Sequence, residues 1–257
     1  SAPIDAGVQA RWRSYPALRS DRGAALFDRI EPMLLSRLGE AARPHEALLA
    51  FDGFLAGLPA GVQLFSLFEA NPSLVDLLVD IVSTSPALAT YLSRNAQVLD
   101  AVLGGSFFAP WPGPPALQAD AAARMAAISD YEAKLDTIRV WAREWHFRIG
   151  VHMLRSLVTA EEAGQHYAEL ASACVAALWP EVTAQFARRP GEPPGRGAVV
   201  LGMGSLGAGR LTPQSDLDLL LIYHPPAVQM SDAPPPFPPR PHSARLTHAL
   251  LSSTPPP

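Results

Sequence analysis

The sequence predicts a mainly α-helical chain in which a helical domain is followed by a small α/β unit, and three observations support this fold class. Apolar residues recur at helical spacing through most of residues 46–187. A stretch rich in proline and glycine then leads into two apolar runs that are typical of strands, Val199–Met203 and Leu217–Tyr223. Beyond them, residues 225–257 hold 11 of the 27 prolines. Because proline cannot donate to a β-ladder, we expect this tail to be disordered.

These changes of composition divide the chain into five predicted segments. The first contains one helix near Ala24–Leu38, and its Trp12 and Tyr15 are expected to pack onto the domain that follows. The prolines and glycines between Arg188 and Gly197 mark the main domain boundary. The predicted segments are a leading segment over residues 1–45, a helical domain over 46–187, a linker over 188–197, a partial α/β core over 198–224 and a proline-rich tail over 225–257.

Local signals predict where several helices of this domain begin. We expect Ser73 to cap a helix that runs to Ser83, because a serine hydroxyl can accept from the free N–H groups of a helix start. Ser85-Pro86 should begin the next helix, since proline is favoured at the first helical position. Ala119–Val158 reads as one long helix with apolar residues on or near one face.

The last helix of the domain is predicted to start at a capping box. Thr159 is followed three residues later by Glu162, a pair that can satisfy two backbone N–H groups reciprocally. The helix should run from Ala160 to about Val182. We expect interruptions near Gly164 and Pro180, because both residue types weaken a helix interior.

Composition limits the class of protein. The net charge is −4 and no block of basic residues occurs, which argues against nucleic acid as the main partner. The sequence has no apolar run of 18 residues and no signal-peptide pattern, so we expect neither a membrane span nor secretion. Cys174 is the only cysteine and lies in an apolar stretch, which predicts a buried thiol. A chain without an intrachain disulfide fits a reducing compartment, and we expect a cytoplasmic protein.

The candidate functional site lies where the first strand-like run ends. Gly204 and Ser205 form a turn there, and a ten-residue connection, Leu206–Ser215, leads to Asp216 and Asp218. In an extended chain, residues i and i+2 point to the same face, so the two carboxylates should project together while Leu217 faces a core. Two carboxylates can hold Mg²⁺ together with substrate phosphates. Glycine lets backbone N–H groups approach phosphate oxygens, and a serine hydroxyl adds to them.

Each part of this pattern also has a simpler explanation. An Asp-x-Asp pair alone is often a solvated strand end, and a Gly-Ser pair alone is usually only a turn. The order of strand, Gly-Ser turn, short connection, Asp-x-Asp and strand is much rarer, and it favours nucleotidyl transfer. His146, His152 and His166 lack the spacing of a metal site, and we expect them to be surface or internally satisfied histidines.

The motif resembles the signature of the polymerase-β-like nucleotidyltransferase superfamily and, within it, the catalytic motif of glutamine synthetase adenylyltransferases. The helical part is similar to the start of the second, adenylylating half of those enzymes. The resemblance covers most of the chain from about Trp12 to Tyr223. It is carried by these stretches: Phe51–Leu55, Leu58–Leu67, Glu69–Pro72, Phe147–Val151, Gly202–Gly207, Leu211-Thr212 and Ser215–Leu219.

The resemblance implies a fold and an activity. It implies that residues 198–224 belong to a truncated α/β nucleotidyltransferase domain, and that AMP passes from ATP to a tyrosine hydroxyl of glutamine synthetase. Asp216 and Asp218 would be the catalytic carboxylates and the ligands of Mg²⁺, and Gly204 and Ser205 would bind phosphate. The partners implied are glutamine synthetase, ATP and a PII-type signalling protein that regulates nitrogen assimilation.

The chain departs from the family pattern in three places. Ser205 stands where the family usually has lysine, and Ala208-Gly209-Arg210 stand where it has Gly-Arg-Glu. A later acidic strand followed by an Arg-Pro-Ser-Gly segment is absent. We therefore expect a fragment with little activity of its own. Two alternatives stay open, namely a catalytically silent helical module that docks glutamine synthetase or a regulator, and a nucleotidyltransferase for a different substrate.

Overall fold

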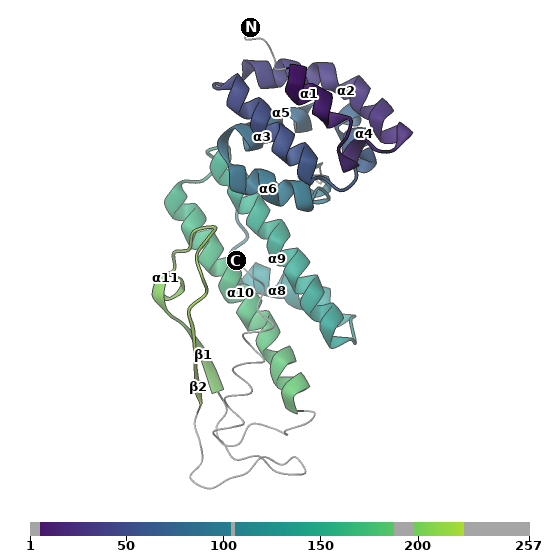
Figure 1. Cartoon of the computed structure of the whole chain (residues 1–257). Coiled ribbons are helices and arrows are strands. Elements are labelled where there is room, and N and C mark those ends of the chain that lie inside the picture. The colour runs from purple at the N-terminus through teal and green to yellow at the C-terminus, as the bar shows by residue number, and fades with distance from the viewer. Residues whose placement is uncertain (1–5, 104–105, 188–197, 224–257) are drawn as a thin grey trace. The chain divides into compact units, whose positions relative to one another are not determined.

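The computed structural model describes residues 6–103, 106–187 and 198–223, and these are mainly helical, as predicted (Figure 1). Contacts divide the chain into two compact units, Ser1–Ala109 and Pro110–Pro257. The division falls inside the predicted helical domain over 46–187. The predicted linker over 188–197 and the whole of the predicted tail over 225–257 lie outside the described residues. None of the described helices combines the length and the apolar character needed to cross a membrane.

The first unit is a set of helices packed around an apolar core. Helix α3 packs on α5 and α6, and α2 packs on α4 (Figure 1). Aromatic rings fill the centre, where the Trp12 ring makes edge contacts with Phe27 and Phe51. The elements of this unit are α1 (Ala6–Trp12), a short 3-10 helix (Pro16–Leu18), α2 (Asp21–Glu40), α3 (Pro44–Gly57), α4 (Val62–Ala70), α5 (Ser73–Thr84), α6 (Pro86–Arg94) and α7 (Val98–Leu103).

The helix starts in this unit follow local rules, with one exception. The Ser85 hydroxyl accepts from the Leu88 amide at 3.4 Å, and Pro86 occupies the first turn of α6, which confirms the predicted start. The prediction that Ser73 caps α5 is wrong. Pro72 already has helical dihedral angles and takes the cap position, so Ser73 is the first residue inside the helix and makes no cap.

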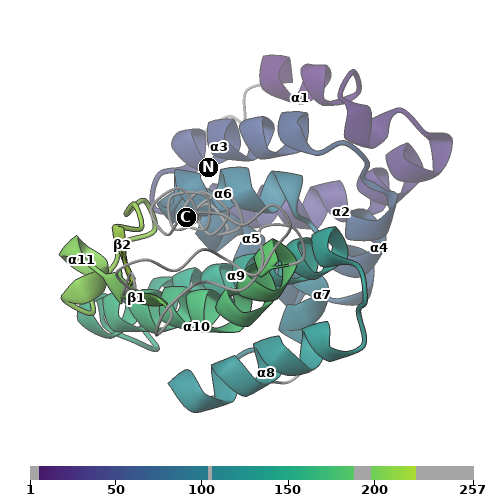
Figure 2. The same ribbon diagram turned by 90° about the horizontal axis from the view of Figure 1, so that it is seen from below.

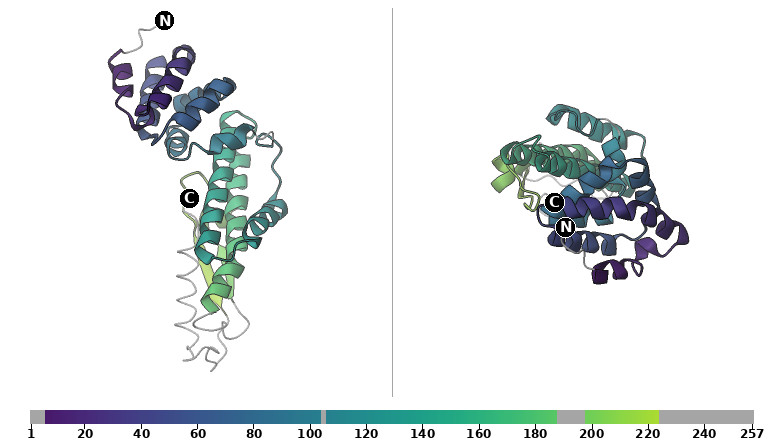
Figure 3. Two further views of the ribbon diagram at one scale, coloured as in Figure 1. Left: turned by 90° about the vertical axis from the view of Figure 1, so that its right-hand side faces the viewer. Right: turned by 90° about the horizontal axis from the view of Figure 1, so that it is seen from above.

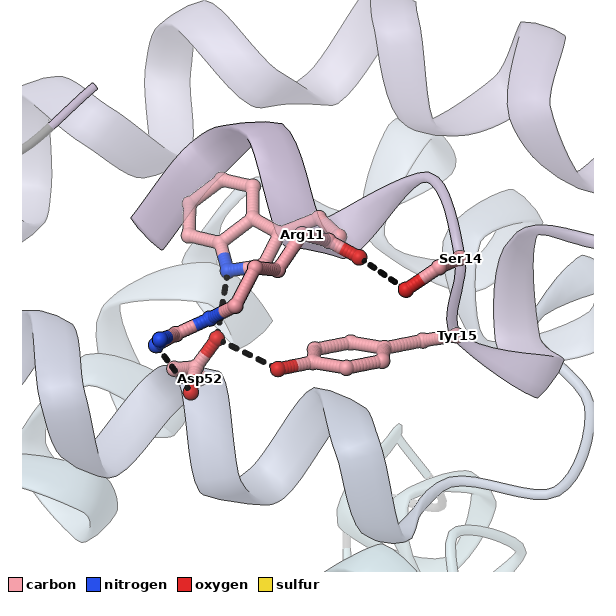
Figure 4. A network of polar contacts seen from close by, with 5 residues as sticks. Arg11, Ser14, Tyr15 and Asp52 are labelled. Carbon is pink, nitrogen blue, oxygen red and sulfur yellow. Dashed lines mark hydrogen bonds and ion pairs between the residues drawn. The ribbon is translucent and has the colours of Figure 1, made fainter. Parts of the chain in front are cut away.

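The Asp52 carboxylate on α3 ties the residues before α2 to the rest of the unit (Figure 4). Its Oδ1 accepts from the indole N–H of Trp12 at 3.1 Å and from the Tyr15 hydroxyl at 2.9 Å. Its Oδ2 pairs with the Arg11 guanidinium at 3.2 Å. Burial and the neighbouring Asp52 carboxylate both raise the pKa of Tyr15. Trp12 is fully buried, so the prediction that Trp12 and Tyr15 pack onto the following domain is confirmed.

Removing this carboxylate should destabilise the first unit. We expect Asp52→Ala to lower the free energy of unfolding by about 1–3 kcal/mol, because the buried Trp12 indole would lose its acceptor. Asp52→Asn keeps one oxygen and should cost less. Urea denaturation followed by tryptophan fluorescence measures both. The matched control is Asp28→Ala, since Asp28 pairs with Arg13 at the surface and such pairs contribute at most about 1 kcal/mol. Equal losses for Asp52→Ala and Asp28→Ala would contradict the assignment.

The second unit places a two-stranded ribbon against long helices. Helices α9 and α10 run side by side with α8 packed against both (Figures 2 and 3). The strands β1 and β2 pair antiparallel, from Ala198 opposite Tyr223 to Gly202 opposite Leu219. One face of the ribbon packs on the core of the helices through Val200, Leu219 and Leu221. The elements are α8 (Pro114–Ala126), α9 (Tyr131–Leu154), α10 (Ala160–Ala187), β1 (Ala198–Gly202), α11 (Gly204–Gly207) and β2 (Leu219–Tyr223).

The structure corrects the predicted helix between Ala119 and Val158. The segment forms two helices, α8 and α9, that are separated after Ala126. The Asp130 carboxylate accepts from the Ala133 amide at 2.8 Å and caps the start of α9. The long apolar pattern concealed this cap, because both helices place their apolar residues in the same core.

Helix α10 also differs from the prediction, because it runs without interruption past Gly164 and Pro180. Proline in a helix interior costs about 3 kcal/mol. Leu178 and Val182 on either side are buried in the core of the unit, and their burial offsets this cost. The start of α10 agrees with the sequence. The Glu162 amide donates to the Thr159 hydroxyl at 3.2 Å and the Thr159 amide donates to the Glu162 carboxylate at 2.7 Å, so the predicted capping box is confirmed.

Cys174 lies on the buried side of α10, as predicted, with 2% of its surface exposed. Burial raises the pKa of its thiol to about 12. The reactive thiolate is therefore scarce at neutral pH, and the residue serves as a small apolar side chain in the core.

Candidate active site

The candidate site is formed by the segment that connects β1 to β2 in the second unit. Strand β1 ends at Gly202, and the short helix α11 begins at Gly204. The second strand was predicted over Leu217–Tyr223, but β2 begins only at Leu219, and Asp216 and Asp218 lie in the segment just before it. The Met203 amide donates to the Asp218 carbonyl at 2.7 Å, so the pairing of the two segments continues by one hydrogen bond beyond β1 and β2.

Exposure alternates along the segment that carries the aspartates. Asp216 and Asp218 are exposed, whereas Leu217 and Leu219 are half-buried. Both leucines pack against the core formed with α9 and α10. This alternation is what an extended chain produces when one face is covered, and it places the two carboxylates on the same, open face.

The Gly204 backbone and the Asp218 carboxylate lie directly against each other. Gly204 has a positive φ of 53°, a conformation that residues with a side chain rarely adopt. A Cβ atom built on Gly204 would overlap Oδ2 of Asp218. The backbone angle therefore favours glycine, and the overlap shows that the carboxylate would have to turn away from any side chain at this position. Ser205 follows in the first turn of α11 and is exposed, so the turn and one carboxylate share a single surface.

A side chain at Gly204 should separate the turn from Asp218. We expect Gly204→Ala to speed hydrogen exchange of the Met203 amide about fivefold or more, since a strained φ alone costs about 1–3 kcal/mol. Hydrogen exchange read by NMR gives the rate for that amide. Gly53→Ala is the matched control. Gly53 is an exposed helical glycine of α3 with no atom near the position of a Cβ, and alanine there should stabilise the helix by about 0.5–1 kcal/mol. An unchanged Met203 rate in Gly204→Ala would contradict the assignment.

The connection between the turn and the aspartates is held on α10. The Leu211 amide donates to the Gly164 carbonyl at 3.0 Å, and the Leu211 side chain is buried in the core of the unit. A Cβ on Gly164 would lie 3.3 Å from the Leu211 carbonyl oxygen, so glycine permits this approach. Arg210 pairs with Glu161 at 2.8 Å, but both side chains are largely exposed. From the sequence alone, Gly164 was predicted only to weaken a helix, and no local signal indicated this role.

The described residues offer a pair of metal-binding side chains at this site and no larger group. Within the described ranges, no cluster of three or more histidine, cysteine, aspartate or glutamate side chains could hold a metal ion. Mg²⁺ commonly binds through one or two carboxylates plus phosphate oxygens of the substrate. Asp216 and Asp218 therefore suit a metal that arrives with a phosphate-bearing ligand better than a metal held by the protein alone.

Comparison with known proteins assigns the chain to a class. The family model described as glutamate-ammonia ligase adenylyltransferase matches residues 75–254. This match takes in most of the second unit, including the Gly-Ser turn and both aspartates. The chain belongs to the glutamate-ammonia ligase adenylyltransferase family.

Individual relatives are described as bifunctional enzymes. The chain is 38% identical over 240 residues to a bifunctional glutamine synthetase adenylyltransferase/adenylyl-removing enzyme of Brucella melitensis, 93% of this chain and 24% of the relative. The corresponding enzyme of Mesorhizobium japonicum is 37% identical over the same shares of the two chains. That of Caulobacter vibrioides is 35% identical over 207 residues, 80% of this chain and 20% of the relative. The chain thus spans about a quarter of the length of these relatives.

Proposed function

We propose that the second unit carries part of a nucleotidyl-transfer site that moves AMP from ATP to a tyrosine hydroxyl of glutamine synthetase. The contact of the Asp218 carboxylate with the Gly204 turn is the observation that carries this proposal. In a chain of this family, the contact joins a phosphate-binding turn to a carboxylate on the open face of the ribbon. Regulation by a PII-type signalling protein and a cytoplasmic location belong to the same proposal.

The chemistry required of these residues is orientation and charge compensation. In AMP transfer, the acceptor hydroxyl oxygen bonds to the α-phosphorus, the bond from that phosphorus to the bridging oxygen breaks, and pyrophosphate leaves while the hydroxyl loses its proton. The Gly204 and Ser205 amides and the Ser205 hydroxyl can donate to phosphate oxygens. Because no side chain stands at Gly204, phosphate can approach the backbone closely.

The residues also fit a Mg²⁺ ion. The donors are two exposed carboxylates on one face, Asp216 and Asp218, and hard divalent cations prefer such oxygen ligands. Oδ2 of Asp218 lies where a Cβ of Gly204 would stand, so one of the two carboxylates lies against the turn. Mg²⁺ bound there would neutralise negative charge on the triphosphate. The carboxylates would contribute by fixing the nucleotide so that the α-phosphorus faces the acceptor.

The first test measures nucleotide binding. We expect Asp216→Asn and Asp218→Asn each to weaken binding of Mn²⁺–ATP about tenfold or more, because each removes a charged oxygen ligand worth about 1.5–3 kcal/mol. Isothermal titration calorimetry of the 257-residue chain gives the dissociation constants. Asp136→Asn is the control, since Asp136 is exposed on α9 and pairs with Arg139. Binding unchanged by Asp216→Asn and Asp218→Asn would end the metal assignment.

The second test measures AMP transfer. Purified chain, labelled ATP, Mg²⁺ and glutamine synthetase are incubated beside a full-length family member. We expect much less label from this chain for two reasons. At the candidate site, the described residues form no metal-binding group of three or more side chains. The two-stranded ribbon is also marginal without further packing partners. Mass spectrometry identifies the modified tyrosine, and addition of a PII-type protein tests regulation. Equal labelling by both proteins would show that the 257 residues suffice, and labelling of another acceptor would replace the proposed substrate.

A further inference from the structure

The first unit contains a cavity between the segment that follows α3, the helix α4 and the connection from α6 to α7. Its volume is about 170 Å³, which corresponds to roughly six water molecules. Helix α4 supplies one wall. Gln63 and Leu64 stand four and three residues before Leu67, so all three lie on one face of that helix.

The close packing of α6 on α3 fixes the opposite wall. Gly57 ends α3 and lies against Ser93 of α6, because a Cβ built on Gly57 would stand 2.9 Å from the Ser93 hydroxyl oxygen. Ser93 is buried, and its hydroxyl donates to the Thr90 carbonyl at 2.8 Å. Arg94 follows Ser93 directly and ends α6. The contact between Gly57 and Ser93 therefore sets the point at which the arginine side chain leaves the helix.

The lining combines an apolar floor with a single charge. Leu58 and Leu64 are buried, with 1% and 3% of their surfaces exposed, and Leu67 is half-buried. Arg94 is the only charged side chain among the described residues that line the cavity, and it is exposed. A ligand in this space would thus meet leucine side chains on one side and a cation at the rim.

The polar side chains of the lining have no partners within the part of the chain that the structure describes. The Arg94 guanidinium makes neither an ion pair nor a hydrogen bond to any described residue, and the same holds for the side-chain amides of Gln63 and Gln97. A guanidinium carries five N–H donors and no acceptor, and its fork matches the two oxygens of a carboxylate. Each glutamine adds both donors and an acceptor.

We propose that this cavity binds a small organic carboxylate with a compact apolar body. Arg94 pairs with the carboxylate, and the apolar body lies against Leu58, Leu64 and Leu67. The volume limits the ligand to roughly six to eight non-hydrogen atoms. The inference goes beyond the proposed function and does not rest on it, since every residue that it uses belongs to the first unit.

The probe is isocaproate, a branched aliphatic acid of this size, and its binding to the full 257-residue chain is followed by NMR titration. Two matched compounds separate the two parts of the ligand. Isocaproamide keeps the apolar body and removes the charge, whereas acetate keeps the charge and removes most of the body. We expect saturable shifts of the Leu64, Leu67 and Gln97 amides with isocaproate, and binding at least about tenfold weaker for each of the other two compounds.

Three substitutions locate the binding. Arg94→Gln removes the charge and keeps an amide at the rim. Ala60→Trp adds bulk at another exposed position of the lining. Arg22→Gln is the matched control, because Arg22 is an exposed arginine of α2 that does not line the cavity. All three positions are exposed, so we expect folded variants, which circular dichroism and thermal unfolding verify. The comparison of the three compounds needs no variant at all.

The expected result is a distinct response to each change. Arg94→Gln should weaken isocaproate binding about tenfold or more and leave the weak binding of isocaproamide unchanged. Ala60→Trp should weaken the binding of both compounds, and Arg22→Gln should affect neither. The inference is overturned if isocaproate does not bind saturably, or if isocaproamide binds equally well. Shifts confined to residues away from the cavity, or an unchanged affinity in Arg94→Gln, would also overturn it.

Discussion

The backbone contact between Leu211 and Gly164 is the constraint on which the candidate site depends. A ribbon of two strands is marginal in water by itself, so its position must come from what it packs against. The amide of Leu211 reaches the Gly164 carbonyl at 3.0 Å because α10 presents no side chain at that point. The buried Leu211 side chain adds apolar contact to the same place. Because the turn, the aspartates and the ribbon are continuous in the chain with Leu211, this contact also positions them.

At this site, the candidate catalytic carboxylates and the leucines that stabilise the ribbon alternate along one stretch of backbone. Leu217 and Leu219 point into the core, while Asp216 and Asp218 point outward. Because side chains alternate with a period of two, a slip of one residue would bury both carboxylates and expose both leucines. Burying two unpaired carboxylates is far too costly to occur. The register that buries the leucines is therefore the one that presents the aspartates together.

Charge plays different parts in the two units. In the first unit, the largely buried Asp52 carboxylate accepts from both Trp12 and Tyr15, so one charge satisfies two donors next to the core. In the second unit, the Arg210–Glu161 pair beside the candidate site is exposed on both sides and contributes little by itself. The site is thus positioned by apolar packing and backbone hydrogen bonds, and its position does not depend on its exposed carboxylates.

The sequence by itself determined the features that depend on neighbours within a few residues. The capping box of Thr159 and Glu162, the start of α6 at Ser85-Pro86 and the same-face spacing of the aspartates are local, and the pattern of residue types contains them. Family membership was likewise readable from the motif. Tertiary structure alone decided that α10 continues through Pro180, because burial of Leu178 and Val182 outweighs a local penalty. It also decided that the Gly164 carbonyl accepts from the Leu211 amide, since residues so far apart in the chain meet only when the connection packs on α10, and no local pattern indicates such a contact.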